Sequence, residues 1–391
     1  MNTSMIMRSQ AGVPGGSGVP GGQIGMIQIA RALPALGCQV SLFVGGPRMA
    51  YLDGLDDIHP TYLRWPAWLD TATAAAPERL RAIGKRVRRR RWLAAITALP
   101  GFAAADVVHV QGLEDAEALL TKVNGPLVVT HWGRIGRWLS TGTDPAADEA
   151  LARRIDRLRT NVTLVAIGNA QAQTLADAGL PVAAVIPAGL DLQHFTPGDR
   201  AQARSGLGLA LDDGVVLYVG RLAPDKNVAT LLKAFARLHR QIRSSRLLVL
   251  GDGPTKASLQ RLSGQLGIDE AVTFLPFVPH HLLPAYYRAA DVTVVPSDYL
   301  ETFCMVALEA VACGCPLIVT DQVPEILQAF PGVPSITPYD VNGLRERIAA
   351  ALRGELSPAD NTRISNYGWS AVARHYADLY QTAHRHRSSS W

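Results

Sequence analysis

The sequence predicts an α/β fold built from two doubly wound, Rossmann-like domains. The chain has 391 residues, a length typical of two domains. Short apolar runs alternate with helical patterns, which indicates parallel sheets covered by helices on both faces. This alternation starts again after Pro187–Arg200, a stretch rich in Pro, Gly and Asp that is typical of a linker.

Six apolar runs in the first half have the length and composition of buried strands. They are Ser4–Met7, Gln39–Val44, Asp106–Val110, Pro126–Thr130, Thr163–Ile167 and Val182–Ile186. Helical patterns lie between several of these runs, including Gln23–Leu36 and Ala170–Ala178.

The second half repeats the same pattern. Its predicted strands are Val215–Val219, Arg246–Leu250, Ala271–Leu275, Asp291–Val295 and Pro316–Thr320. Its predicted helices are Val228–Ile242, Lys256–Leu266 and Phe303–Ala312, followed by a final helix from Asn366 to Trp391 with a polar end. In sheets of this kind, ligands bind beyond the carboxyl ends of the strands.

Composition excludes several classes of protein. A net charge of +5 is too small to indicate nucleic-acid binding by itself, and we recognise no nucleic-acid-binding motif in the sequence. The longest nearly uncharged apolar run, Trp92–Ala105, is shorter than the roughly 20 residues that span a bilayer. Met1–Gln10 lacks the apolar core of a signal peptide. We therefore expect a cytoplasmic protein.

Four cysteines occur, at positions 38, 304, 313 and 315. The Cys313–Cys315 spacing matches no usual zinc pattern and has no partner pair. We expect reduced thiols inside the core, no disulfides and no metal.

The segment Glu301–Pro316 is the most informative part of the chain. Glu309 is the only charged residue between Thr302 and Thr320. Because an ionised carboxylate in an apolar helix is costly unless it is hydrogen-bonded, a polar group or a ligand's hydroxyls must meet it. Glu301 precedes the helix, where free backbone amides favour anions such as phosphate. The alternative is structural: a capping Glu301, and a Glu309 paired with a buried Arg.

A second segment, Tyr218–Asn227, places two cations after a strand. The strand ends at Gly220, Arg221 follows directly, and Lys226 comes five residues later, just before a helix. An arginine fork and a lysine ammonium suit a leaving diphosphate. The alternative is a solvated ion pair between Arg221 and Asp225.

These segments resemble the family-4 retaining glycosyltransferases, which adopt the GT-B fold of two Rossmann-like domains facing across a cleft. Glu301 and Glu309 match that family's Glu-x7-Glu signature, and Cys313-Gly-Cys-Pro316 follows it as the family's strand entry does. The resemblance implies that Glu301 binds the donor sugar's hydroxyls and Glu309 binds the ribose. Cys304 stands where the family usually has Gly.

The resemblance assigns further donor contacts. Arg221 and Lys226 match the family's Gly-Arg-Leu…Lys element, which begins at Gly220 and would hold the diphosphate. The backbone amides of the helix start would face the diphosphate or the sugar, and the Gly-x-Gly-Pro turn would line the base site. The residues concerned are Phe303, Cys304 and Met305 for the helix start, and Gly253 for the turn.

The resemblance also implies a domain division. Val185–Asp191 resembles the family's interdomain stretch, and Trp369–Tyr380 its closing helix. We predict an acceptor-side domain over residues 1–190 and a nucleotide-sugar domain over 191–365. The helix over 366–391 would cross back to the first domain.

The Gly-rich stretch Gly16–Gly21 fits a dinucleotide-binding spacing, but the second strand carries no carboxylate near its end, which argues against a dehydrogenase. Gly21 and Gly22 instead resemble the family's first glycine loop, with a flexible loop as the alternative. His131 follows an apolar strand, and the resemblance places it near the donor sugar. A packing or turn role is the alternative for His131.

The predicted reaction is transfer of a hexosyl unit from a nucleoside diphosphate sugar, UDP-sugar favoured, to an acceptor hydroxyl. The resemblance implies retention of configuration, with His131, Arg221, Lys226 and Glu301 as catalytic residues. Neither a metal nor another cofactor is expected, because the cations replace it. The expected acceptor is small and polar, such as an aminocyclitol or an aminoglycoside antibiotic intermediate, with Glu114, Asp115 and Glu117 suited to an amine.

Two alternatives stay open. Six of the seven residues in Lys85–Arg91 are cationic, so the enzyme could contact a membrane surface and use a lipid-linked or envelope glycan acceptor. The architecture also fits a nucleotide-sugar epimerase. His280, His281, His384 and His386 are interpreted as surface residues without a ligand role.

Overall fold

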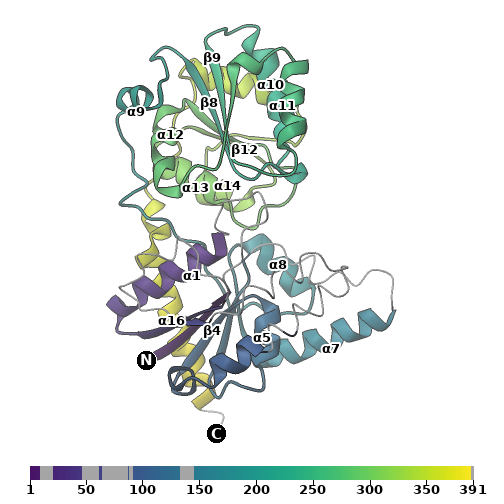
Figure 1. Ribbon diagram of the computed structural model, residues 1–391, viewed down its shortest axis with the longest axis vertical. Coiled ribbons are helices and arrows are strands. Elements are labelled where there is room, and N and C mark those ends of the chain that lie inside the picture. The colour runs from purple at the N-terminus through teal and green to yellow at the C-terminus, as the bar shows by residue number, and fades with distance from the viewer. Residues whose placement is uncertain (9–20, 46–60, 64–86, 88–90, 133–144, 389–391) are drawn as a thin grey trace. The chain divides into compact units, whose positions relative to one another are not determined.

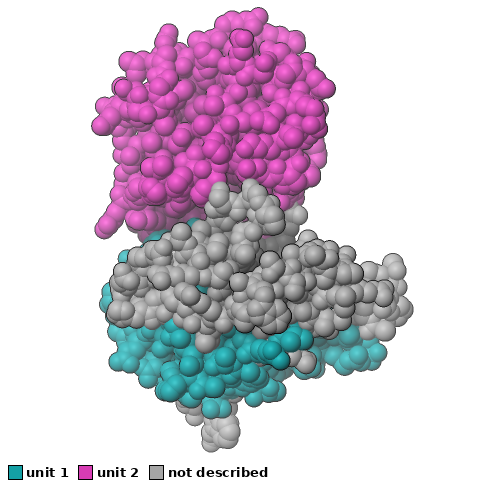
Figure 2. Space-filling model, viewed as in Figure 1, with its two compact units in different colours: residues 1–12, 19–189, 369–391 teal, residues 13–18, 190–368 magenta. Residues whose placement is uncertain are grey.

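The computed structural model describes residues 1–8, 21–45, 61–63, 87, 91–132 and 145–388. The chain forms two compact units (Figure 2). Unit 1 comprises the described residues up to Gly189 together with the last helix from Trp369, and unit 2 comprises Leu190–Gly368.

Unit 1 is built on a seven-stranded, fully parallel sheet with the order β3-β2-β1-β4-β5-β6-β7. Its strands are β1 (Asn2–Arg8), β2 (Gln39–Gly45), β3 (Thr61–Leu63), β4 (Val107–Gln111), β5 (Leu127–Thr130), β6 (Thr163–Ala166) and β7 (Ala184–Val185). Its helices are α1 (Gly21–Ala32), α4 (Pro100–Ala103), α5 (Leu113–Leu119), α7 (Pro145–Asn161), α8 (Asn169–Asp177) and α16 (Trp369–Ser388), with a 3-10 turn at Leu33–Leu36.

Alternating side chains of the unit 1 strands face two separate cores. Val107 and Val128 pack with α1 and α16 on one face, whereas Val108 and Val129 pack with α5 and α8 on the other. Figure 1 shows α1 and α16 on one side of β4 and α5 on the other. The apolar run that begins at Trp92 belongs to the second core. Across the described residues, no helix combines the length and apolarity that crossing a bilayer requires.

A buried polar cluster joins α16 to the sheet of unit 1. His109 on β4 hydrogen-bonds through Nδ1 with Tyr380 Oη (2.7 Å) and through Nε2 with Thr130 Oγ1 (2.7 Å). Tyr376 Oη in turn lies 2.9 Å from Thr130 Oγ1. All four residues are fully buried, and burial lowers the pKa of His109 to about 3. We call His109, Thr130, Tyr376 and Tyr380 the histidine–tyrosine cluster.

Unit 2 is built on a six-stranded parallel sheet with the order β10-β9-β8-β11-β12-β13. Its strands are β8 (Gly214–Val219), β9 (Ser245–Leu250), β10 (Val272–Leu275), β11 (Val292–Val295), β12 (Leu317–Thr320) and β13 (Ser335–Ile336). Its helices are α9 (Arg200–Leu207), α10 (Val228–His239), α11 (Lys256–Gln265), α12 (Leu283–Ala289), α13 (Met305–Ala312), α14 (Pro324–Ala329) and α15 (Val341–Leu352). Its 3-10 turns are η3 (Pro224–Lys226), η4 (Asp269–Ala271), η5 (His280–Leu282) and η6 (Ile364–Tyr367).

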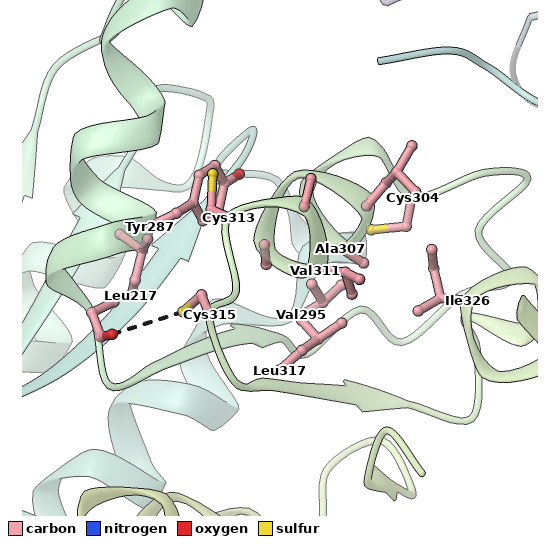
Figure 3. Packing of buried hydrophobic residues seen from close by; sticks show 14 of the residues in the cluster. Leu217, Tyr287, Val295, Cys304, Ala307, Val311, Cys313, Cys315, Leu317 and Ile326 are labelled. Atoms are coloured by element: carbon pink, nitrogen blue, oxygen red, sulfur yellow. Dashed lines mark hydrogen bonds between the residues drawn. The ribbon is translucent and has the colours of Figure 1, made fainter. Parts of the chain in front are cut away.

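The strands of unit 2 also face two cores. Val215 and Leu217 pack with α12 and α13, and Val216 and Tyr218 pack with α10, α11 and α15. Figure 1 shows α12 on one side of β8 and α10 and α11 on the other. The first of these cores contains Cys304, Cys313 and Cys315, with Cys313 beside Tyr287 and Cys304 toward Ile326 (Figure 3). All four cysteines of the chain are free and buried, and burial raises the pKa of the three in this core to about 12.

The predicted fold class is confirmed in both halves. Each sheet is parallel and reverses its strand order once, at the β1–β4 pair in unit 1 and at the β8–β11 pair in unit 2. The short edge strands β3 and β13 were not predicted. They contain three and two residues, too few to show any periodicity.

Candidate active site

The candidate site in unit 2 lies where the strand order reverses. β8 and β11 are neighbours in the sheet, and the chain leaves both at the same edge because they run parallel. Lys226 follows β8, and Glu301 follows β11. Side chains separated by 75 residues are therefore brought together beyond the carboxyl ends of the strands, the place where doubly wound sheets bind ligands.

Lys226 and Glu301 form a tight, partly buried ion pair. Lys226 Nζ donates to Glu301 Oε1 at 2.6 Å, and the two side chains are 20% and 8% exposed. Ser297 Oγ donates to the same oxygen at 2.6 Å, and Tyr299 Oη donates to Oε2 at 2.8 Å. Lys226 Nζ also donates to Tyr299 Oη at 2.8 Å and lies 4.9 Å from the centre of the Tyr299 ring.

Electrostatics keeps the Lys226 ammonium charged at neutral pH. Burial by itself lowers the pKa of Lys226, but the charge of Glu301 and the hydrogen bonds to it and to Tyr299 raise that pKa above its ordinary value. Burial, followed by the charge of Glu301, raises the pKa of Tyr299, so its hydroxyl stays a donor. The result is a protonated Lys226 held at a strand end by Glu301 and Tyr299. Sequence reasoning missed Ser297 and Tyr299, although both lie within four residues of Glu301.

Arg221 occupies a different environment. Its side chain is 59% exposed and pairs with Asp225, with 3.1 Å between Nη2 and Oδ2. This is the solvated ion pair considered above as the alternative for this segment. The Arg221 guanidinium is open to a ligand, but in this structure it does not join the Lys226–Glu301 pair.

Glu309 is buried and does not pair with either predicted cation. Its carboxylate accepts a hydrogen bond from His280 Nε2 at 2.8 Å and another from the Tyr287 hydroxyl at 2.6 Å. His280, interpreted above as a surface residue without a ligand role, is only 43% exposed, and its ring reaches the signature carboxylate. Its place after the end of β10 was the one available signal, since strand ends of such sheets line binding sites.

The start of α13 supplies backbone amides at this edge. Cys304 is the N-cap in an extended conformation (φ −100°, ψ 93°), and the helix runs for eight residues from Met305. The Cys304 side chain makes no capping hydrogen bond. Phe303 and Met305, predicted to present amides to the donor, flank this cap.

Two predicted glycines have a structural reason for being glycine. Gly253 adopts φ +156°, and a Cβ there would lie 2.2 Å from the carbonyl oxygen of Leu222. Gly220 adopts φ +149°, with the Tyr218 hydroxyl 3.0 Å from where its Cβ would be. The positive φ favours glycine at both positions, and at Gly253 the close backbone carbonyl also leaves no room for a Cβ.

The remaining predicted residues belong to unit 1. Gly21 and Gly22 are the first two residues of α1. His131 directly follows β5: its backbone N–H donates to Val165 O at 3.3 Å, and its carbonyl accepts from Gln171 Nε2 at 3.1 Å. The role of His131 toward the sugar stays a prediction. Most of the basic run Lys85–Arg91 lies outside the described residues.

The acidic residues proposed for an amine-bearing acceptor are otherwise engaged. Glu117 on α5 pairs with Arg154 at 3.0 Å and with Arg157 at 2.9 Å, both on α7. Asp115 is buried. Glu117 therefore links α5 to α7, and a role of these acids toward an amine stays a prediction. Within the described ranges, no three His, Cys, Asp or Glu side chains gather as metal ligands would.

Comparison with known proteins identifies the class. The family model described as "Glycosyl transferases group 1" matches residues 199–369. A D-inositol 3-phosphate glycosyltransferase of Frankia alni is 30% identical over an alignment that covers 98% of each chain. The enzyme of the same description from Nocardia farcinica is 46% identical over 145 residues, which span 35% of this chain and 32% of that protein.

Solved structures share the whole fold at low sequence identity. The sucrose-phosphate synthase of Thermosynechococcus elongatus has a TM-score of 0.69 at 24% identity, covering 97% of this chain and 98% of that one. HepE of Anabaena, solved in complex with UDP, has a TM-score of 0.67 at 18% identity, covering 100% and 99%. Two parallel α/β units of this kind are the GT-B fold. The chain belongs to the group 1 glycosyltransferases.

Proposed function

We propose that this enzyme transfers a hexosyl unit from a nucleoside diphosphate sugar, with UDP-sugar favoured, to a hydroxyl of a small polar acceptor with retention of configuration. The observation that carries the proposal is the Lys226–Glu301 ion pair at the strand-order reversal of unit 2. A carboxylate and an ammonium at this point match the sugar hydroxyls and the phosphate of one donor molecule.

The diphosphate would meet three sources of positive charge. Lys226 supplies a point charge whose pKa is raised, Arg221 supplies an exposed guanidinium, and the start of α13 supplies backbone amides with the helix dipole behind them. Such groups stabilise the charge that develops on a leaving diphosphate, so the site needs no metal for this purpose. The solved HepE complexes contain UDP or UDP-glucose, which supports uracil as the base of the donor.

The two carboxylates of the signature would hold different parts of the donor. Glu301 retains acceptor capacity for the hydroxyls of the sugar, and Glu309 for those of the ribose. No side-chain nucleophile is assigned to the reaction. The departing diphosphate would remain on the face that the acceptor attacks and would take up the acceptor's proton, while the protein positions both partners.

The proposed acceptor is a cyclitol, a carbocyclic ring that carries several hydroxyl groups. It is supported by the relatives, which are described as D-inositol 3-phosphate glycosyltransferases. An aminocyclitol belongs to the same ring class, but Glu117 and its arginine partners give no support to an amine at that position.

The test is a thermal-shift panel of UDP, GDP and UDP-hexoses, followed by measurement of UDP release with inositol, inositol phosphates and aminocyclitols as acceptors. A nucleotide at 100 times its Kd stabilises the folded state by about 2.7 kcal/mol. We expect Lys226→Ala and Glu309→Ala to abolish the shift.

The matched controls are Lys233→Ala and Glu346→Ala, which change exposed residues of the same unit. Both should shift as the unaltered protein does. Ser297 and Tyr299 remain as donors to Glu301 in Lys226→Ala, so this variant should fold. A full nucleotide shift in Lys226→Ala or Glu309→Ala would contradict the proposal.

A further inference from the structure

Glu309 has two hydrogen-bond donors within the protein, which the proposed contact with the ribose does not by itself require. The side chain is 4% exposed and lies among the apolar residues of the α12–α13 core. Each carboxylate oxygen already accepts one hydrogen bond, from His280 Nε2 and from the Tyr287 hydroxyl. Because a carboxylate oxygen has two lone pairs, both oxygens keep the capacity to accept one more.

The two donors differ in their access to solvent. Tyr287 is fully buried, whereas the His280 side chain is 43% exposed. Of these three side chains, His280 is by far the most exposed.

The His280 ring is held in place from several elements. It packs on Phe195 of the linker segment, Pro187–Arg200, with 4.8 Å between ring centres. Phe195 also packs on Tyr287. The charged or titratable groups around it are Glu309 on α13, Tyr287 on α12, and Asp191 and His194 on the linker segment, with His281 adjacent in the chain. Burial alone lowers the pKa of His280, but the hydrogen bond and charge of Glu309, with the charge of Asp191, raise it above the ordinary value.

The His280 donor fixes the orientation of the Glu309 carboxylate. Hydrogen bonds to ionised groups are stronger than neutral ones, and two of them at opposite oxygens restrict the side chain to one rotamer. The lone pairs that remain then point in defined directions. Without the His280 donor, Glu309 would keep only Tyr287 and could turn its free oxygen away from the ligand.

We propose that His280 is a positioning residue that orients Glu309 for the ribose hydroxyls, and that the preference for ribose over deoxyribose depends on it. The inference rests on the proposed function, in which Glu309 binds the ribose. It extends that function by assigning to His280 a share of donor selectivity that operates through Glu309.

The test compares UDP with 2′,3′-dideoxy-UDP by calorimetry, or the guanosine pair if the panel selects GDP. The measured quantity is the Kd of 2′,3′-dideoxy-UDP divided by the Kd of UDP. We expect His280→Ala to lower this ratio about tenfold, with the loss confined to the ribonucleotide. His280→Gln keeps an N–H donor and should restore part of the ratio. His281→Ala, a change of the neighbouring exposed histidine, should leave it unchanged.

The outcomes distinguish a failure of this inference from a failure of the proposed function. Equal weakening of both nucleotides in His280→Ala, or no change in either, would overturn the inference. If the unaltered protein binds UDP and 2′,3′-dideoxy-UDP equally well, Glu309 does not contact the ribose and that part of the proposed function fails. If neither UDP nor GDP binds, the proposed function fails as a whole.

Discussion

The two units each bury a group of polar side chains, but the groups differ in charge and in access. The histidine–tyrosine cluster of unit 1 is closed, and burial keeps His109 neutral by lowering its pKa to about 3. In unit 2 Lys226 pairs with Glu301 and His280 with Glu309, the pKa of each of the two basic groups is raised, and each pair includes a partly exposed member.

This difference separates a structural role from a functional one. In unit 1 both ring nitrogens of His109 find partners within the protein, so the cluster specifies where α16 packs and has no remaining site for a ligand. In unit 2 the carboxylates keep acceptor capacity, and one partner of each is partly exposed. Such groups are where the proposed function places the ligand.

The largest expected effect comes from removing a ring of the closed cluster. Tyr376→Ala would leave a cavity and leave Thr130 without one of its partners. We expect the free energy of unfolding to fall by about 3–5 kcal/mol, the range of large-to-small changes at buried aromatic residues. Urea denaturation followed by circular dichroism measures this loss. Arg374→Ala, an exposed change on the same helix, is the control and should have little effect.

A smaller effect is expected from deleting one hydroxyl. Tyr380→Phe keeps the ring but leaves Nδ1 of His109 without its hydrogen bond in a fully buried place. We expect a loss of about 1–3 kcal/mol in the free energy of unfolding, the penalty for an unsatisfied buried polar group. A loss below a few tenths of a kcal/mol would show that the cluster contributes packing alone.

The smallest effect is a pH dependence whose sign differs between the units. The pKa of His109 is about 3 in the folded protein against 6.5 ordinarily, so below pH 6.5 the unfolded chain binds a proton that the folded chain does not. Stability therefore falls as the pH drops, by roughly 1 kcal/mol between pH 6.5 and 5.5. His109→Gln should remove this part of the pH dependence in denaturation curves.

His280 should act in the opposite direction. Its folded pKa is raised, so its contribution to stability is complete below pH 6.5 and is lost as the pH rises through the folded value. The difference between the unaltered protein and His280→Gln should therefore shrink toward alkaline pH. The same sign for His109 and His280 would contradict the distinction between a neutral and a charged cluster.

Sequence patterns predicted the regular elements well where the local signal was long. Buried strands such as β8 read as continuous apolar runs, and α13 begins two residues after the predicted start at Phe303. The short strands β3 and β13 were missed because they are paired edge segments with no pattern of their own. The order of the strands follows from the handedness of the crossovers and from packing, which no single segment records.

For the site, the sequence identified the charged residues but not all of their partners. Glu309 could be singled out because a lone charge inside an apolar helix requires a polar partner. That the partners are Tyr287 and His280 could not be inferred, because they lie 22 and 29 residues away on other elements. Arg221 pairs with Asp225, four residues along the chain, and its action together with Lys226 on a diphosphate stays a prediction.

The sequence alone determined that this chain forms two parallel α/β units and that acidic and basic side chains follow particular strands, because both properties are written in local periodicity and composition. The tertiary structure alone decided which of those charges meet. Strand order brings Lys226 to Glu301, and helix packing brings His280 to Glu309. Such contacts depend on how distant segments are placed in space, and local physical chemistry does not specify that placement.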